Sequence, residues 1–390
     1  IKKTMQAVRD PLWKHIFLSD SLYEASQTKD FLRLHSIKQL GPTYLVYPGA
    51  THTRASHSYG VYEVASRLIK NLMQKGAKNW VSREGMLSFL AASLFHDLGH
   101  FPYTHSLKEL PLLDHEILTG EILLKEPLRS LIGKTGANPE RVAAIVDTTK
   151  NTSDFETLFY RKLLSGVLDP DKLDYLNRDA FFCGVPYGIQ DTDFVLAKLI
   201  PDKEKGIVID SSAMLSCENV LFSKYLMYKA VYWHKTVRII TAMMKKTLYV
   251  ALKNEIIQAK ELYSIDDQGL FTLLESKEYF EELECADAVK NKALFKVIFE
   301  CPFDEHNPKH KALENLGNRD IIEKELANAL HCKSSFLLID IPERISFESD
   351  LFILDENTNF SNSSTIFTSK TVENFTSSLR KIRLALSPVF

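Results

Sequence analysis

Histidines and one carboxylate are crowded into a short stretch of the chain. Half of the twelve histidines fall between residues 50 and 116, at His52, His57, His96, His100, His105 and His115. His57 precedes Val61 by four residues, which places it on the inward face of the same predicted helix. His96 and Asp97 end an apolar helical run, where an unpaired ionisable pair is costly to bury. A divalent metal would satisfy this pair, but so would hydrogen bonds to the helix end, and the spacing leaves both open.

A second cluster follows in the sequence LDPDKLDYLNRDAFF, which begins at Leu168. One side of a predicted helix over 170–181 carries acids, cations and an aromatic hydroxyl at helical spacing: Asp171, Lys172, Tyr175, Arg178 and Asp179. Leu173 and Leu176 bury the opposite side. A charged face of this kind fits a solvated surface as well as the wall of an active-site cleft.

Helices must position these clusters. Apolar residues at helical spacing predict a helix over 56–74, a second that begins at Arg83 and is apolar on almost all sides, and a third that Asp114 caps. Further helices are predicted at 138–149, 155–166, 170–181 and 212–255. We therefore expect a mainly α fold, with an all-helical catalytic domain over residues 1–260 whose core spans about 50–185.

The pattern changes after about residue 262. Short helical pieces alternate with β-type runs at 294–300, 335–341 and 350–355, and an amphipathic helix is predicted over 371–386. We expect residues 261–390 to form a smaller α+β lobe that serves oligomerisation or regulation.

Composition narrows the function classes. Lys and Arg number 48 against 50 Asp and Glu, so the net charge of -2 provides no overall attraction to nucleic acid or an anionic membrane, although a local basic groove stays open. The five cysteines are scattered, which is typical of a reducing compartment. No apolar run is long enough to span a bilayer, and no signal-peptide core is present. A cytoplasmic location is expected.

The two clusters together resemble a known signature. The order His57, His96-Asp97, Asp171 is similar to the H…HD…D pattern of the HD phosphohydrolase superfamily. Five separated blocks resemble, in order, those of its deoxynucleoside triphosphate triphosphohydrolase branch: residues 37–61, 95–105, 114–116, 168–185 and 225–236. The resemblance covers roughly residues 8–250.

This resemblance implies one divalent metal ion per active site, held by His57, His96, Asp97 and Asp171. Two imidazoles and two carboxylates suit Mn, Mg, Fe, Ni or Zn. The implied reaction converts a deoxynucleoside triphosphate (dNTP) and water to a deoxynucleoside and triphosphate. A homo-oligomer, either a dimer or a tetramer, is implied as well.

The resemblance also assigns phosphate-binding and catalytic roles. It implies that Arg54, Lys172 and Arg178 are the phosphate cations and that His100 and His105 line the phosphate path. His115, oriented by Glu116, is the candidate proton donor. Asp97 and His100 are grouped with the catalytic residues.

The sugar and base are assigned to other residues. Tyr175, Asp179 and Gln39 are expected to hold the sugar, with Asp179 and Gln39 at its 3′-hydroxyl. Tyr232 is expected to face the base or the sugar. Two histidines match no functional position: His52 is expected to be structural, and His234 to serve packing.

Three positions depart from the pattern of this branch. His35 stands where the regulated animal enzymes have an arginine of their activator site, so we do not expect an activator site here. Lys224 replaces an arginine that reaches the substrate phosphates. A guanidinium, which can donate two parallel hydrogen bonds to a phosphate, is thereby replaced by an ammonium group with a compact charge. Trp233 replaces a polar residue near the base. Base preference and nucleotide-activated assembly are therefore in doubt.

Two other functions stay open. The metal set would also serve an HD nucleotidase or phosphodiesterase acting on other phosphate esters. A non-catalytic nucleotide-binding scaffold could keep the same fold, although it would not need all four ligands.

Overall fold

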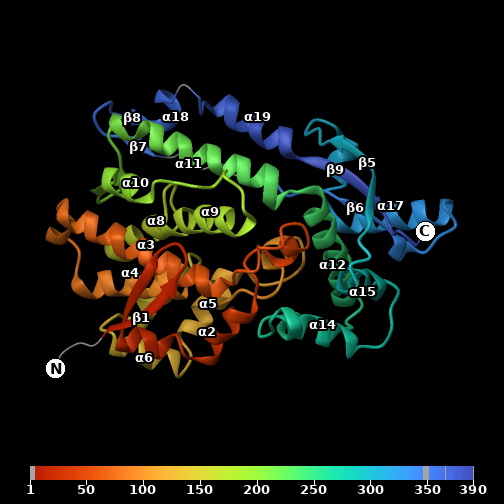
Figure 1. Cartoon of the computed structure of the whole chain (residues 1–390), viewed down its shortest axis with the longest axis horizontal. Helices are drawn as coiled ribbons and strands as arrows, with labels where there is room; N and C mark the ends of the chain where they lie inside the picture. The colour runs from red at the N-terminus through yellow and green to blue at the C-terminus, as the bar shows by residue number, and fades with distance from the viewer. Residues whose placement is uncertain (1–4, 346–350, 365, 390) are drawn as a thin grey trace.

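The computed structural model describes residues 5–345, 351–364 and 366–389. It is mainly helical, as predicted, and the strands of these described residues form four small sheets. In Figure 1 the helices up to α11 pack together on one side of the molecule, and the three-stranded sheet lies at the opposite end beside α12. Among the described residues, no helix combines the length and the apolar composition that crossing a membrane requires.

Three helices form the centre of the helical region. Helix α3 (Arg54–Gln74) packs against both α4 (Arg83–Phe95) and α9 (Pro170–Cys183). Helix α3 begins two residues earlier than predicted, because the side chains of Thr53 and Ser56 each accept a hydrogen bond from the other's backbone N–H. These three helices carry the residues of both chemical clusters.

Shorter helices surround this centre. Helix α5 begins at His115, where Asp114 caps it as predicted by accepting from the backbone N–H of Glu116. The short helices of the first 213 residues, α5 among them, are α1 (Asp20–Ala25), α2 (Lys29–Arg33), η1 (Leu34–Ser36), η2 (Gly41–Leu45), η3 (Ala77–Asn79), η4 (Thr104–Leu107), α5 (His115–Leu123), α6 (Leu128–Lys134), α7 (Pro139–Val146), α8 (Phe155–Leu164), α10 (Thr192–Lys198) and η5 (Ser211–Ala213).

Two hairpins in this region were not predicted. Strand β1 (Met5–Asp10) pairs antiparallel with β2 (Lys14–Ser19), and β3 (Ile200–Asp202) pairs with β4 (Gly206–Val208). In β2 the buried Ile16 and Leu18 alternate with the exposed Phe17. This period of two was visible in the sequence, but it extends over too few residues to stand out.

The long helix predicted over 212–255 is divided into three pieces. Helix α11 (Met214–Met227) runs into a π-helical turn, η6 (Tyr228–Tyr232), and α12 (Lys235–Lys253) begins after it. His234 starts α12 by accepting from the backbone N–H of Thr236 at 3.3 Å. The wider π turn directs aromatic side chains toward the cavity described below, which is a common use of this distortion.

The remaining elements belong to the C-terminal third. They are α13 (Ala259–Leu262), α14 (Asp267–Glu275), α15 (Leu283–Lys290), β5 (Lys296–Pro302), α16 (Pro308–Ala312), α17 (Leu316–Ala329), η7 (Ser334–Phe336), β6 (Leu337–Asp340), β7 (Phe352–Ile353), β8 (Thr358–Asn359), α18 (Phe360–Ser363), α19 (Ser369–Leu379) and β9 (Lys381–Leu386). Strand β9 pairs antiparallel with both β5 and β6. The three predicted β runs correspond to β5, β6 and β7, although 350 lies outside the described residues.

The predicted helix over 371–386 is wrong in its second half. The helix ends at Leu379, and Lys381–Leu386 is the central strand of the sheet. Pairing on both edges gives this segment two sets of inter-strand hydrogen bonds, so tertiary context overrides the helical periodicity.

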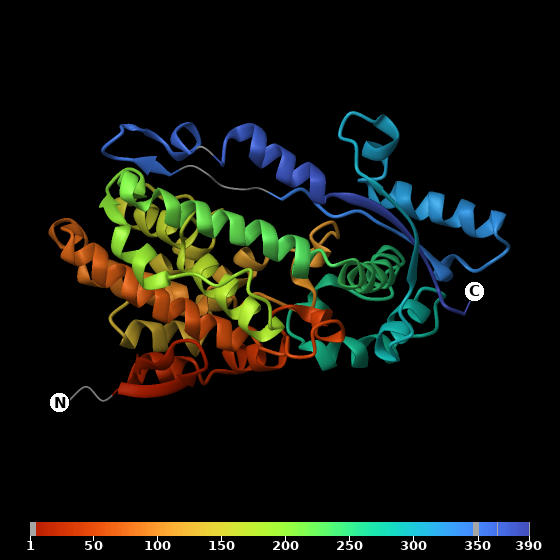
Figure 2. The ribbon, with the colours of Figure 1, turned by 45° about the horizontal axis from the view of Figure 1, so that its top comes forward.

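The C-terminal segment also returns to the helical region. Figure 2 shows α18 and α19 running beside α11. Ile353 forms an isolated bridge with Ile209, and the rings of Phe375 and Tyr225 stack at 4.3 Å. Phe360 and Phe367 are buried in the same hydrophobic cluster as α3 and α4. The domain boundary near residue 260 stays a prediction.

Candidate active site

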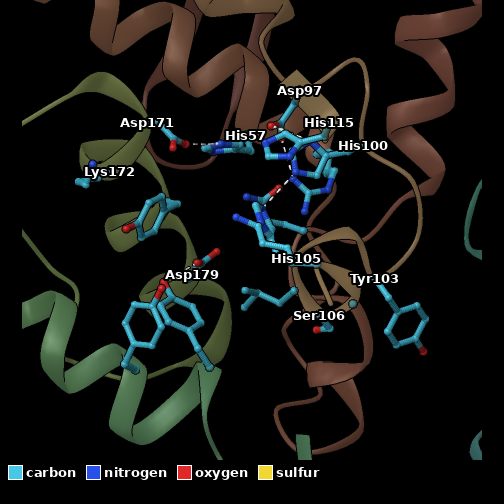
Figure 3. A pocket seen from close by; sticks show the side chains of 18 of the residues that line it. His57, Asp97, His100, Tyr103, His105, Ser106, His115, Asp171, Lys172 and Asp179 are labelled. Atoms are coloured by element: carbon cyan, nitrogen blue, oxygen red, sulfur yellow. Dashed lines mark hydrogen bonds and ion pairs between the residues drawn. The ribbon is translucent and has the colours of Figure 1, made fainter. Parts of the chain in front are cut away.

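One cavity of about 550 Å³ collects the two chemical clusters. Its size is within the range of ligand pockets, roughly 300–1,000 Å³. Figure 3 shows Asp171, Lys172 and Asp179 facing the histidines across it. Fifteen of the sixteen predicted site residues line the cavity: Gln39, Arg54, His57, His96, Asp97, His100, His105, His115, Glu116, Asp171, Lys172, Tyr175, Asp179, Lys224 and Tyr232.

The predicted metal ligands lie together at one end. Ligand atoms of His57, His96 and Asp97 are all within 4.8 Å of one another. Asp171 joins them, with Oδ1 at 2.9 Å from His57 Nε2 and 3.8 Å from His96 Nε2. The three supporting elements are α3, the end of α4 and the first turn of α9. This set brings two imidazoles and two carboxylates to one point.

The outer nitrogen of each imidazole fixes its orientation. His96 Nδ1 lies 2.9 Å from the carbonyl of Ser93, and His57 Nδ1 lies 2.8 Å from Asp174 Oδ2. A nitrogen that donates outward leaves the other free to bind a metal. His96 Nε2 is buried and makes no hydrogen bond within the described residues. Burying such an atom is costly, so the donor set fits a divalent cation.

The charges at this end favour a cation. Burial alone would raise the pKa of Asp97, but His100, His96 and Arg54 outweigh it and hold that pKa well below its usual range. Burial would lower the pKa of His57, but Asp171 and Asp174 outweigh it and raise the value to about 10. A cation and a proton therefore compete for His57 Nε2.

Basic groups adjoin the metal end. Arg54 Nη1 donates to Asp97 Oδ2 at 2.8 Å, and its Nε is buried without a partner within the described residues. His100 lies 3.1 Å from Asp97 through Nδ1 and 3.1 Å from His105 through Nε2. Burial and the charge of Arg54 hold the pKa of His100 well below its usual range. These groups form a cluster of N–H donors suited to phosphate oxygens.

His115 is oriented by a different acid from the one predicted. Its Nδ1 lies 3.1 Å from Asp114 Oδ1, and its ring is 4.0 Å from that of His100. Asp114, the helix cap, therefore occupies the orienting position that the sequence analysis gave to Glu116. The Glu116 carboxyl lines the cavity instead, where burial raises its pKa.

A polar set lies farther along the wall. Asp179 accepts from Tyr232 Oη at 2.7 Å and contacts His52 Nε2 at 2.7 Å. Gln39 is tied to the same place by its backbone N–H, which donates to the carbonyl of His52. The Gln39 side-chain oxygen is buried without a partner within the described residues. His52 is thus structural, as expected, but it holds an acid that was predicted to bind the sugar.

The structure contradicts the role predicted for Arg178. Its side chain is fully buried, donates to Asp174 at 2.8 and 2.9 Å and to Asp10 at 2.8 Å, and is absent from the cavity wall. The helical spacing was correct, but the side chain turns back to Asp174 four residues earlier. Arg178 is therefore not a phosphate cation.

The other two cations differ in their surroundings. Lys172 Nζ donates to Asp169 Oδ2 at 2.7 Å and to the carbonyl of Gly166 at 2.8 Å, which holds it at the cavity. Lys224 is buried and lines the same cavity. Trp233 lines it as well, whereas the exposed His35 is absent from its wall.

Comparisons with known proteins agree with this geometry. Residues 54–175 match the HD domain, and residues 194–375 match the HD associated region. The chain is 37% identical over 267 residues to the uncharacterized protein YwfO of Bacillus subtilis, covering 68% of this chain and 58% of that one. It is 28% identical to the deoxynucleoside triphosphate triphosphohydrolase SAMHD1 of Bos taurus, covering 75% of this chain and 56% of that one. The chain thus spans less than two thirds of the length of these relatives.

Solved structures share the whole fold. A hypothetical protein of Aquifex aeolicus superimposes with a TM-score of 0.77 at 26% identity, covering 98% of this chain and 97% of that one. A phosphohydrolase of Bacteroides thetaiotaomicron superimposes with a TM-score of 0.76 at 23% identity, covering 98% of this chain and all of the other. The chain therefore belongs to the HD superfamily, in the branch that includes the deoxynucleoside triphosphate triphosphohydrolases, and consists of an HD domain followed by an HD associated region.

Proposed function

We propose that this protein is a metal-dependent phosphohydrolase that converts dNTPs to deoxynucleosides and triphosphate. One observation carries the proposal: a single cavity holds the four metal ligands, the Arg54–His100–His105 cluster and the Asp179–Tyr232 pair. A nucleoside triphosphate presents the matching groups, namely phosphates beside a sugar hydroxyl. The triphosphohydrolase name of the bovine relative supports the same substrate class.

The residues divide the work between binding and proton transfer. His57, His96, Asp97 and Asp171 would hold a divalent cation, which would supply Lewis-acid polarisation of a phosphoryl group when bound. Arg54, Lys172 and Lys224 would neutralise phosphate charge, and His100 and His105 would donate N–H groups to phosphate oxygens.

His115, paired with Asp114, would deliver the proton to the leaving group. His115, fixed through Nδ1 by Asp114, keeps Nε2 as the nitrogen that can pass a proton to the leaving oxygen. Its neighbour Glu116 adjoins the same cavity, and burial raises the pKa of its carboxyl, so it holds a proton more readily than an exposed carboxyl does.

Recognition of the sugar would fall to the opposite wall. Asp179 can accept a hydrogen bond from a 3′-hydroxyl while Tyr232 and His52 hold it in place. The Gln39 side chain adds an oxygen without a partner within the described residues, and Tyr175 lines the space between the sugar and the metal. Assembly into a dimer or tetramer is part of the proposal and follows the resemblance alone.

Product analysis tests this proposal. Purified protein is incubated with dNTPs, with deoxynucleoside monophosphates and with a cyclic dinucleotide, in Mn²⁺ or Mg²⁺, and the phosphate products are resolved. Triphosphate released from dNTPs is the expected result. Phosphate from monophosphates alone would point to a nucleotidase, and nucleotide binding without any product would point to a scaffold; each result would contradict the proposal.

A further inference from the structure

A buried network connects the N-terminal hairpin to the metal end of the cavity. We propose that Trp13, Asp10 and Arg178 are positioning residues, which hold Asp174 so that His57 presents Nε2 to the metal. The inference rests on the proposed metal site, but it concerns residues outside the cavity wall. It also gives Arg178 a role in place of the one that the structure rejects.

Asp174 is at the centre of this network and is fully buried. Its Oδ2 contacts His57 Nδ1 at 2.8 Å and accepts from Arg178 Nε at 2.8 Å. Its Oδ1 accepts from Arg178 Nη2 at 2.9 Å and from the indole N–H of Trp13 at 2.5 Å. Four contacts on two oxygens leave this carboxylate no freedom to rotate away from His57.

The hairpin completes the network from the other side. Arg178 Nη1 donates to Asp10 Oδ2 at 2.8 Å. The second oxygen of Asp10 accepts from the backbone N–H groups of Leu12 and Trp13, both at 2.9 Å, which shapes the turn between β1 and β2. The same turn therefore places the indole of Trp13 on Asp174 and the carboxylate of Asp10 on Arg178.

Close packing at Gly60 shows how tightly the network is held. Gly60 is one helical turn beyond His57, and a Cβ added there would lie 2.0 Å from Asp174 Oδ1 and 2.3 Å from Arg178 Nη2. Any side chain at this position would have to displace the ion pair. Glycine therefore allows α3 to approach α9 closely enough for His57 to reach Asp174.

The position of Asp174 matters because His57 lies between two acids. Its Nδ1 is 2.8 Å from Asp174, and its Nε2 is 2.9 Å from Asp171. A neutral imidazole carries one N–H, and only the form protonated at Nδ1 has a free Nε2 lone pair for a metal. A well-placed Asp174 favours that form, whereas a misplaced one would let His57 donate to Asp171 and close the site.

The test compares Mn²⁺ binding by three full-length variants with that of the wild type. Trp13→Phe removes the indole N–H and keeps an aromatic ring, and Asp174→Asn removes the charge and keeps the shape. The matched control is Trp80→Phe, because Trp80 packs on Phe155 and Phe159 away from the cavity. Calorimetric titration of chelator-treated protein gives the affinity, and ¹⁵N-histidine spectra recorded with diamagnetic Zn²⁺ in place of Mn²⁺ show whether His57 carries its proton on Nδ1.

We expect Trp13→Phe and Asp174→Asn to weaken Mn²⁺ binding by roughly ten- to a hundredfold. Both variants should reduce the signal of His57 protonated at Nδ1 and keep the circular dichroism spectrum of the wild type. Trp80→Phe should keep the wild-type Mn²⁺ affinity and the wild-type His57 signal. Equal affinity in the wild type and both variants would overturn the inference and leave the proposed metal site intact. Failure of the wild type itself to bind Mn²⁺ would overturn both.

Discussion

Two groups of buried polar side chains differ in whether their polar atoms are hydrogen-bonded within the described residues. In the C-terminal third, Asp340 is 1% exposed and accepts from Arg238 at 2.6 and 3.2 Å and from Arg383 at 3.4 Å. In the cavity, His96 Nε2 and Arg54 Nε at the metal end, and the side-chain oxygen of Gln39 farther along the wall, are buried but make no hydrogen bond within the described residues. The hydrogen-bonding atoms of Asp340 are therefore satisfied by protein groups, whereas those of the cavity are not.

This difference distinguishes residues that support the fold from residues that bind a ligand or a metal. An unsatisfied buried polar atom costs about 1–3 kcal/mol, and several of them in one cavity are expected where a ligand or metal supplies the missing partners. A saturated buried pair needs no ligand and stabilises the fold only in comparison with its broken form. Substitutions in the two groups should therefore have opposite consequences.

The largest effect is expected from Asp97→Ala or His96→Ala. Either change should lower phosphohydrolase activity by roughly a thousandfold or more, because the metal contributes several kcal/mol of transition-state stabilisation. The midpoint of urea unfolding in chelator should change little for His96→Ala, because His96 Nε2 makes no hydrogen bond within the described residues. Asp97→Ala should also lower that midpoint, because it leaves the buried Arg54 without its carboxylate partner. Metal analysis should find no bound ion. A variant that keeps full activity would contradict the assignment.

Asp340→Asn should show the reverse pattern. It leaves Arg238 and Arg383 buried with a neutral partner, so we expect the free energy of unfolding to fall by about 3 kcal/mol. Mn²⁺ binding per folded chain should be unchanged. Urea unfolding and metal titration on the same sample check both statements. A loss of metal affinity with normal stability would erase the distinction between the two groups.

Tyr232→Phe should have a smaller effect, confined to substrate binding. It removes the O–H that donates to Asp179 at 2.7 Å, an interaction with a charged group worth about 1.5 kcal/mol. This corresponds to roughly a tenfold fall in kcat/KM for dNTPs. The same assay on a dNTP that lacks the 3′-hydroxyl should show a smaller difference between the two enzymes. Equal losses on both substrates would place Tyr232 elsewhere in the mechanism.

The smallest effect concerns acid stability. Burial would raise the pKa of Glu109, but Lys245 of α12 and Arg319 of α17 outweigh it and lower that pKa. Because the pKa of this carboxyl is lower in the folded protein than in the unfolded chain, its ionisation stabilises the fold at pH values above the unfolded-chain pKa of about 4.3. This stabilisation is lost as the pH falls through the pKa of the folded protein. Glu109→Gln should therefore flatten the decline in stability below about pH 4. Urea unfolding from pH 3 to 7 measures the slope, and an unchanged slope would contradict it.

Much of this account could be predicted from residue order. His57, His96, Asp97 and Asp171 together span more than a hundred residues of the sequence, yet their pattern predicted the site that one cavity gathers. Helix starts at Asp114 and Pro170 were also visible, because caps and prolines act locally.

What failed depends on tertiary contacts. Lys381–Leu386 has helical periodicity, but a central position between two strands makes it β9. Arg178 and Asp171 share a helix face, yet Asp10, more than 160 residues away, draws Arg178 into the interior. Trp13 could not be linked to Asp174 from sequence, because no local pattern joins a hairpin turn to a distant helix.

The most direct test of the central claim is an anomalous difference map from crystals of the protein grown with Mn²⁺. We predict one strong peak in the cavity, about 2.0–2.3 Å from Nε2 of His57 and His96 and from carboxylate oxygens of Asp97 and Asp171. The peak should be absent in crystals of His96→Ala. A wild-type map without a peak at these four residues, or with an ion bound elsewhere in the cavity, would contradict the account.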